Sequence, residues 1–149
     1  EYKDIILDIW DTPGQERMRS FVKAYFNNIQ YCLIVCDIFN KKSILDIQKI
    51  WYYYFIKTFP KQEKPIVFLL GNKIDLLKNN NKYSENINLL KKISENLNLP
   101  FFLTCSFDME TIEKVLENIY LQSDNVPVFN NSPIIIDEIE IKQDCCSLQ

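Results

Sequence analysis

The stretch that decides the fold runs from residue 65 to residue 75 and reads Pro65-Ile66-Val67-Phe68-Leu69-Leu70-Gly71-Asn72-Lys73-Ile74-Asp75. It begins with an uninterrupted apolar run, which is typical of a strand buried on both faces of a sheet. Polar residues follow immediately after Gly71. Because parallel sheets present ligand-binding groups at the carboxyl ends of their strands, this stretch predicts a buried strand that leads directly into a binding loop.

Three further apolar runs have the same character, and we expect strands at Ile5–Trp10, Tyr31–Asp37 and Pro100–Thr104. Between the strands, apolar residues recur with helical spacing in Ser43–Phe59, Ser84–Leu97 and Thr111–Leu121. Thr111 is placed to cap the last of these helices. The aromatic residues from Trp51 to Phe55 fit a core-facing stripe, and a partner surface is the alternative. Strands that alternate with helices predict an α/β fold with a parallel sheet.

Composition excludes several classes of function. The chain has 149 residues with 17 Lys and Arg against 20 Asp and Glu, a net charge of −3 that gives no footprint for a nucleic-acid partner. Histidine is absent, which excludes histidine-based nucleophilic pairs and zinc sites that need an imidazole. The 2 glycines are too few and too far apart for a dinucleotide fingerprint or a P-loop. The 5 cysteines are irregularly spaced, so we expect no disulfides.

The composition divides the chain into two parts. We expect one domain over residues 1–122 and a flexible tail over residues 123–149, where polar residues and prolines interrupt any helical period. The charged residues of the tail are mainly acidic, which excludes a polybasic membrane anchor. The apolar runs are all too short to span a membrane.

The first chemically suggestive motif follows the strand predicted at Ile5–Trp10 and reads Asp11-Thr12-Pro13-Gly14-Gln15-Glu16-Arg17. A carboxylate such as Asp11 can hold Mg²⁺ directly or through water. The backbone of Gly14 can approach a terminal phosphate closely, and Gln15 can orient an attacking water without titrating. A simple strand-to-loop turn is the alternative, and for any one of these residues alone it is the better interpretation.

A second motif, Gly71-Asn72-Lys73-Ile74-Asp75, follows a strand in the same way and favours a nucleotide site. A carboxylate such as Asp75 can accept two parallel hydrogen bonds from the N1–H and the exocyclic amine of guanine, a donor pair that adenine lacks. The segment Thr104–Ser106 ends the last predicted strand, where a backbone N–H can meet the guanine carbonyl. Together these residues predict recognition of a guanine nucleotide.

With these motifs the chain resembles a small GTPase of the Ras superfamily, most closely of the Rab branch. The resemblance implies a P-loop NTPase-like parallel sheet with helices on both faces. It implies that GTP or GDP binds together with Mg²⁺ and that Gln15 positions the catalytic water. The nucleotide-binding residues that it implies are Asp11, Gly14, Asn72, Lys73, Asp75 and Ser106, with Asp11 also at the metal.

Three departures from the Rab pattern affect this interpretation. Pro13 replaces an alanine and stiffens the first switch-region residues, and Phe107 stands where the family usually has lysine. The third departure is the larger one, because the sequence starts after the P-loop, its strand and the switch I threonine. That strand lies centrally in the family's sheet, between those predicted at Ile5–Trp10 and Tyr31–Asp37. We therefore expect a truncated gene model or fragment that alone binds GTP negligibly. A genuine nucleotide-free, lipid-anchored interaction module is the alternative.

The chain ends in Cys145-Cys146-Ser147-Leu148-Gln149, which fits both a C-a-a-X prenylation box with Gln last and the adjacent-cysteine ending of Rab proteins, and two unmodified cysteines are the alternative. Because one lipid chain anchors weakly, the motif favours modification of both cysteines. The resemblance implies a role in vesicle traffic at the cytoplasmic face of endomembranes, with cycling through the cytosol. The partners it implies are exchange factors, GTPase-activating proteins, effectors and prenyl-binding chaperones. Cys32 and Cys36 are interpreted as core residues.

Overall fold

A parallel sheet of three strands organises the part of the chain that the computed structural model describes, namely residues 6–12, 29–59, 65–79 and 83–123. The strands are β1 (Tyr31–Asp37), β2 (Ile66–Asn72) and β3 (Phe101–Leu103), in the spatial order β1-β2-β3. Asp37 lies opposite Asn72, and Gly71 lies opposite Leu103. The carboxyl ends of all three strands therefore meet at one edge.

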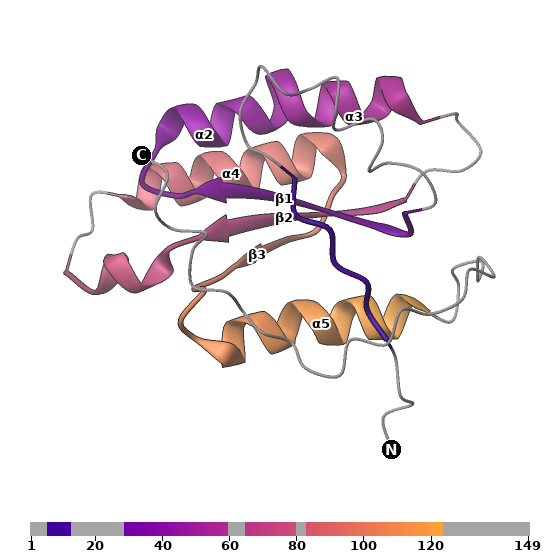
Figure 1. Ribbon diagram of the computed structural model, residues 1–149. Coiled ribbons are helices and arrows are strands. Elements are labelled where there is room, and N and C mark those ends of the chain that lie inside the picture. Colours follow the sequence, from indigo (N-terminus) through magenta and orange to yellow (C-terminus); the bar gives the residue numbers. More distant parts are fainter. Residues whose placement is uncertain (1–5, 13–28, 60–64, 80–82, 124–149) are drawn as a thin grey trace.

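Helices cover both faces of this sheet, as predicted (Figure 1). One continuous helical segment comprises α2 (Lys41–Asp46), a π-helical turn η2 (Ile47–Tyr52) and α3 (Tyr53–Thr58). It lies on the same face as α4 (Ser84–Leu97), whereas α5 (Met109–Ser123) covers the opposite face. A short 3-10 helix, η3 (Ile74–Asn79), follows β2. The α/β architecture is confirmed.

Two apolar clusters hold the layers together, one on each side of the sheet. The larger cluster joins β1 and β2 to the helices Lys41–Thr58 and α4, and its buried members are Ile34, Cys36, Ile44, Ile47, Phe55, Val67, Leu69, Leu90 and Ile93. The smaller cluster joins β2 to α5 through Phe68, Leu70, Val115 and Ile119. Consecutive residues of β2 thus enter opposite clusters, as expected for a strand buried on both faces.

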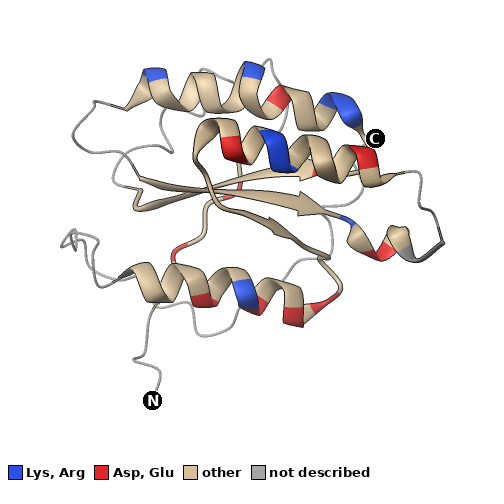
Figure 2. Ribbon diagram, turned by 180° about the vertical axis from the view of Figure 1, so that it is seen from behind, with Lys and Arg blue, Asp and Glu red and all other residues tan. Residues whose placement is uncertain are grey.

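Charge is nearly absent from the sheet. The three strands contain a single charged residue, Asp37, while Lys, Arg, Asp and Glu lie on the helices and the connecting segments (Figure 2). One consequence is that any charge at the carboxyl edge comes from Asp37 and from the loops that follow the strands.

Helix ends are fixed by short polar side chains. Asn40 caps α2, because its Oδ1 accepts hydrogen bonds from the backbone N–H groups of Lys42 at 3.0 Å and Ser43 at 3.3 Å. At α5 the predicted cap was wrong. Asp108 Oδ1 accepts from the N–H of Glu110 at 3.2 Å, while Thr111 lies within the first turn. Asp108 is favoured because an N-cap carboxylate accepts from the second helical N–H.

The helix predicted at Ser43–Phe59 is observed at Lys41–Thr58, but its middle is π-helical. Ile44, Ile47 and Phe55 are buried and Trp51 packs against the larger cluster, which confirms the core-facing interpretation of these four residues. The wider turn was not predicted, since a periodicity of 3.6 residues does not distinguish it from regular α-helix.

The strand predicted at Ile5–Trp10 is wrong. Residues 6–12 have no regular secondary structure, and the exposed fractions of Ile6, Ile9 and Trp10 are 59%, 65% and 61%. A strand needs a neighbour to satisfy its backbone groups, and among the described residues β1 pairs with β2 alone. Val35 on β1 is correspondingly 56% exposed. Asp11 therefore does not follow the end of a strand.

No helix in the described ranges is long and apolar enough to cross a membrane. The tail predicted from residue 123 onward lies outside the described residues, except that Ser123 ends α5.

Candidate guanine-recognition site

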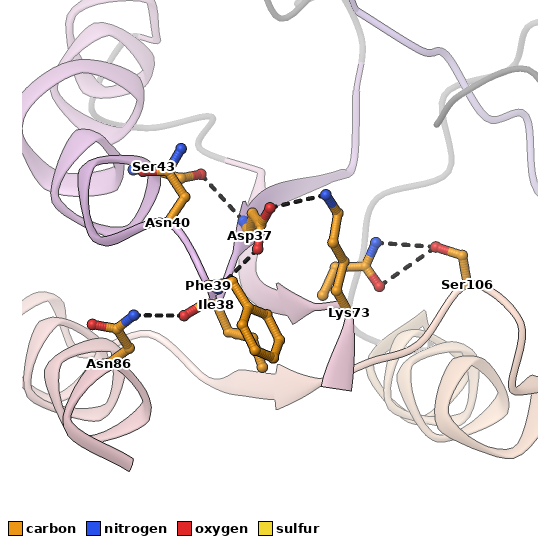
Figure 3. A network of polar contacts seen from close by, with 9 residues as sticks. Asp37, Ile38, Phe39, Asn40, Ser43, Lys73, Asn86 and Ser106 are labelled. Atoms are coloured by element: carbon orange, nitrogen blue, oxygen red, sulfur yellow. Dashed lines mark hydrogen bonds and ion pairs between the residues drawn. The ribbon is translucent and has the colours of Figure 1, made fainter. Parts of the chain in front are cut away.

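The candidate site is assembled from loops at the carboxyl edge of the sheet. Asn72 ends β2, Lys73 and Asp75 follow it, and Ser106 lies in the loop between β3 and α5. Two of the three segments predicted to share this edge are therefore brought together, and Figure 3 shows their polar contacts.

Asn72 joins the two loops. Its Nδ2 donates a hydrogen bond to Ser106 Oγ at 3.0 Å, and its Oδ1 accepts from Thr104 Oγ1 at 3.5 Å. The backbone supports the same junction, because the N–H of Ile74 donates to Thr104 O at 3.2 Å. An amide can donate and accept at once, which a carboxylate of the same shape cannot do. Asn72 thus fixes the Gly71–Asp75 loop against the loop that carries Ser106.

Lys73 adopts a left-handed backbone conformation, with φ of 75°. For a residue other than glycine this conformation carries a steric cost, so other contacts must hold it. The Lys73 ammonium Nζ lies 2.9 Å from Asp37 Oδ2, and the carbonyl of Lys73 accepts from the N–H of Leu76 at 3.2 Å. These contacts tie Lys73 to the end of β1 on one side and to η3 on the other.

Asp75 lies in the first turn of η3 and is partly buried. Its carboxylate makes no hydrogen bond or ion pair with any residue that the structure describes. Both carboxylate oxygens are therefore available as acceptors, which is what two parallel hydrogen bonds from a guanine edge require. These two acceptors are the groups that the predicted pairing with guanine would use.

Gly71 is required by close packing rather than by a special backbone angle, since no glycine in the described residues has a positive φ. A Cβ at Gly71 would lie 2.7 Å from Leu90 Cδ2, 2.9 Å from Ile38 Cγ2 and 3.1 Å from Leu103 Cδ2. The absence of a side chain lets α4 and the β1–α2 turn approach β2 just before the binding loop.

The loop after β3 is held by local hydrogen bonds. The N–H of Cys105 donates to Thr111 Oγ1 at 3.0 Å, and Thr111 Oγ1 donates to Asp108 O at 2.8 Å. Phe107, which replaces the lysine usual at this position, is 79% exposed. Ser106 is thus presented from a loop that is fixed at its base.

Of the predicted phosphate and metal residues, the structure describes Asp11. Asp11 is exposed on the irregular segment 6–12, and Gly14 and Gln15 lie outside the described residues, as do Cys145 and Cys146. Among the residues described, no group of three carboxylates or thiols could hold a metal ion. Mg²⁺ is often held by one or two carboxylates plus substrate phosphates, so Asp11 fits such a site only when nucleotide supplies the remaining ligands.

The thiols of β1 are core groups. Burial raises the pKa of both Cys32 and Cys36 to about 12. At neutral pH both are protonated, and thiols in that state neither bind metal nor act as nucleophiles. The core interpretation of Cys36 is confirmed, since it is 2% exposed.

Sequence reasoning missed Asp37. The residue is the last of β1 and therefore reaches the same edge as Asn72. Asp11 was predicted as a site residue because an acidic residue directly follows an apolar run. Asp37 follows the apolar run Tyr31–Cys36 in the same way, so the same signal could have found it.

Comparison with known proteins identifies the family. The family model described as "Ras family" matches residues 1–125 of this chain.

The chain belongs to the Ras family of small GTPases.

Its similarity within the family is Rab-like. Over 134 residues, 87% of this chain and 66% of the relative, it is 35% identical to the Ras-related protein Rab-7B of Dictyostelium discoideum. Over 152 residues it is 29% identical to the Ypt/Rab-type GTPase ypt7 of Schizosaccharomyces pombe, a match that covers 96% of this chain and 73% of the relative. With Rab-27B of Rattus norvegicus it shares 30% identity over 113 residues, 76% of this chain and 50% of the relative. This Ras-family chain thus spans between 50% and 73% of the length of these relatives. Ras-family proteins in general bind GTP or GDP with Mg²⁺.

Proposed function

We propose that this chain is the guanine-reading part of a Rab-type switch that alternates between GTP and GDP. One observation carries the proposal: the partly buried Asp75 carboxylate has no described partner, and it follows an Asn72 amide that is already locked to Ser106. In such a site the two loops are fixed by hydrogen bonds, and the two carboxylate oxygens of Asp75 are available as acceptors. The site is arranged to receive a base rather than to complete its own hydrogen bonds.

Selectivity for guanine follows from the charge and geometry of Asp75. Its two oxygens pair with the N1–H and the exocyclic amine of guanine, whereas adenine presents an acceptor at N1. Loss of such a pairing leaves a partly buried carboxylate unsatisfied, so discrimination against adenine comes mainly from that penalty. Ser106 lies beside Asn72, where a neighbouring backbone N–H would meet the guanine carbonyl.

Hydrolysis in this proposal belongs to the segment Asp11–Gln15. Gln15 would orient the attacking water, the backbone of Gly14 would contact the γ-phosphate, and Asp11 would hold Mg²⁺ directly or through water. The metal supplies charge neutralisation at the phosphates when it is bound. Pro13 lacks an N–H and has a fixed φ, so the switch segment would respond less to the γ-phosphate than an alanine-containing one.

In the cell, the proposed switch would act in vesicle traffic on the cytoplasmic face of endomembranes. Prenyl groups on Cys145 and Cys146 would provide two lipid anchors, since one chain gives only marginal binding. Exchange factors, GTPase-activating proteins, effectors and prenyl-binding chaperones would be its protein partners. The supporting argument is the Rab similarity of the chain together with its terminal cysteine pair.

The 149-residue chain by itself would hold nucleotide poorly. No Gly-x-x-x-x-Gly-Lys motif occurs in its sequence. If a P-loop supplies about five charge-assisted hydrogen bonds of roughly 1.5–3 kcal/mol each, its absence removes on the order of 7–15 kcal/mol. Micromolar affinity corresponds to only about 8 kcal/mol. Base recognition alone is therefore expected to give millimolar binding at best.

The test is a titration of the chain with fluorescently labelled GDP and Mg²⁺ at micromolar concentrations, followed by guanosine and adenosine at millimolar concentrations by NMR. We expect no saturation with GDP, together with guanosine-specific shifts at Asn72–Asp75 that Asp75→Asn removes. Saturable micromolar GDP binding would contradict the predicted weakness. Equal or absent responses to the two nucleosides would favour the alternative, a nucleotide-free interaction module.

A further inference from the structure

A cluster of contacts around Asp37 connects the base-reading loop to a rigid turn, and the proposed function does not use it. Asp37 Oδ2 lies 2.9 Å from Lys73 Nζ, while Asp37 Oδ1 accepts a hydrogen bond from the N–H of Phe39 at 2.8 Å. The N–H of Asp37 donates to Ser43 Oγ at 3.2 Å. These three contacts lead to Phe39 in the β1–α2 connection, to Ser43 in α2 and to Lys73 (Figure 3).

The turn that anchors Asp37 is itself held from several sides. The N–H of Asn40 donates to Asp37 O at 3.1 Å, and Asn40 caps α2. On the other side, Asn86 Nδ2 of α4 donates to Ile38 O at 2.8 Å. Ile38 is fully buried, and the Phe39 ring packs on Tyr83 with 4.1 Å between ring centroids. Because these contacts come from α2, α4 and β1, the Asp37 carboxylate has a fixed position.

Lys73 has a backbone conformation that must be held by contacts, and it carries a long side chain that is about half exposed. Its backbone has the left-handed φ of 75°, which a side chain with a Cβ adopts only when it is held there. Its flexible side chain would otherwise sample many rotamers. Asp37 Oδ2, 2.9 Å from Lys73 Nζ, links this side chain to the end of β1.

We propose that Asp37 is a positioning residue for guanine recognition: its carboxylate holds the Lys73 ammonium and thereby fixes the Gly71–Asp75 loop against the turn that begins α2. This inference rests on the proposed function, because the loop it positions is the one that carries Asp75. Asp37 itself does not touch the base. It positions the loop through its contact with Lys73. The contacts from α2 and α4 in turn hold Asp37 in place.

The decisive variant is Asp37→Asn. The amide retains an Oδ1 that can accept from the N–H of Phe39, so the turn survives, but its NH₂ group cannot accept from the Lys73 ammonium. The matched control is Glu110→Gln, which removes an ion pair of the same 2.9 Å length, Lys114–Glu110 on α5, without touching the loop. Should Asp37→Asn not fold, Lys73→Gln removes the same contact from the other partner.

Two NMR signals of the complete chain report on the inference without nucleotide. A positive φ at Lys73 gives a strong intraresidue Hα–HN NOE, and a held ammonium group gives a slowly exchanging Nζ signal. We expect Asp37→Asn to lose both and to shift the amides of Asn72–Asp75, while Glu110→Gln leaves them unchanged. An Asp37→Asn variant that keeps the Lys73 NOE, with shifts confined to residues 37–43, would overturn the positioning role.

A guanosine titration separates this inference from the proposed function. We expect Asp37→Asn to weaken guanosine binding about two- to fivefold, the range of a partly exposed ion pair, while Glu110→Gln leaves it unchanged. A wild-type chain whose amides do not respond to guanosine would refute the guanine-reading function. A wild-type chain that responds, with an Asp37→Asn variant that responds equally well, would refute the positioning role alone.

Discussion

The replacement of Gly71 by alanine tests whether the base-reading motif also serves the packing of α4. The added Cβ would lie 2.7 Å from Leu90 Cδ2 and 2.9 Å from Ile38 Cγ2, both closer than such atoms normally approach. Leu90 and Ile38 are fully buried, so neither can move aside into solvent. Overpacking of this kind costs about 1–3 kcal/mol. We expect Gly71→Ala to lower the free energy of unfolding by that amount.

Urea unfolding followed by circular dichroism measures the effect. With an m value of about 1–3 kcal/mol/M, a loss of this size lowers the midpoint by roughly 1 M. The matched variant is Leu90→Val, which lacks the Cδ2 atom that the new methyl group would meet. The double variant should lose less stability than the sum of the two single variants, with a coupling of about 0.5 kcal/mol or more. Additive losses, or a Gly71→Ala midpoint equal to that of the wild type, would refute the packing argument.

Three further variants test other parts of the fold. Burial raises the pKa of Cys36 from its ordinary 9.0 to about 12. The protonated thiol therefore makes its full contribution to the free energy of unfolding below pH 9, and this contribution is lost as the pH rises toward 12. Cys36→Ala should therefore lose less unfolding free energy than the wild type between those limits, measured by urea unfolding at several pH values. Asn98, the C-cap of α4, has a left-handed conformation with φ of 51°, so Asn98→Ala should lower the free energy of unfolding by about 1 kcal/mol and reduce the thermal midpoint, while Asn98→Gly should not. Asn40→Ala removes the cap of α2 and should cost about 1 kcal/mol in urea unfolding, with Lys41→Ala as the neighbouring control.

The elements that the sequence predicted best are those that depend on local pattern and burial. Tyr31–Asp37 and Ser84–Leu97 have the predicted bounds. The first is a continuous apolar run and the second an amphipathic repeat, and each finds the neighbours that its pattern requires in β2 and in the larger apolar cluster.

The strand predicted at Ile5–Trp10 shows the limit of that reasoning. Its apolar run is as strand-like as the others, but strand formation depends on a partner that a local pattern cannot supply. In the described chain β1 pairs with β2 and not with residues 6–12. Ile6 and Ile9 are consequently exposed.

The candidate site likewise has a part that residue patterns predict and a part that depends on tertiary contacts. Residue types at the strand ends placed Asn72 and Ser106 in the same predicted site, and Asn72 Nδ2 lies 3.0 Å from Ser106 Oγ. The pairing of Lys73 with Asp37 spans 36 positions and depends on the register between β1 and β2, which residue patterns do not reveal. The roles of these residues toward nucleotide stay predictions.

The unequal sizes of the two apolar clusters have a consequence for motion. Among the residues that the structure describes, nine buried ones share the cluster on the side of α4, whereas the cluster that holds α5 has four. Segments with less buried apolar surface open at lower free energy, so amide protons of α5 should exchange with solvent before those of α4. Ser106 lies in the loop that leads into α5, whereas Asn72 ends β2, which packs against the larger cluster. Their hydrogen bond therefore crosses the boundary along which the molecule would first come apart.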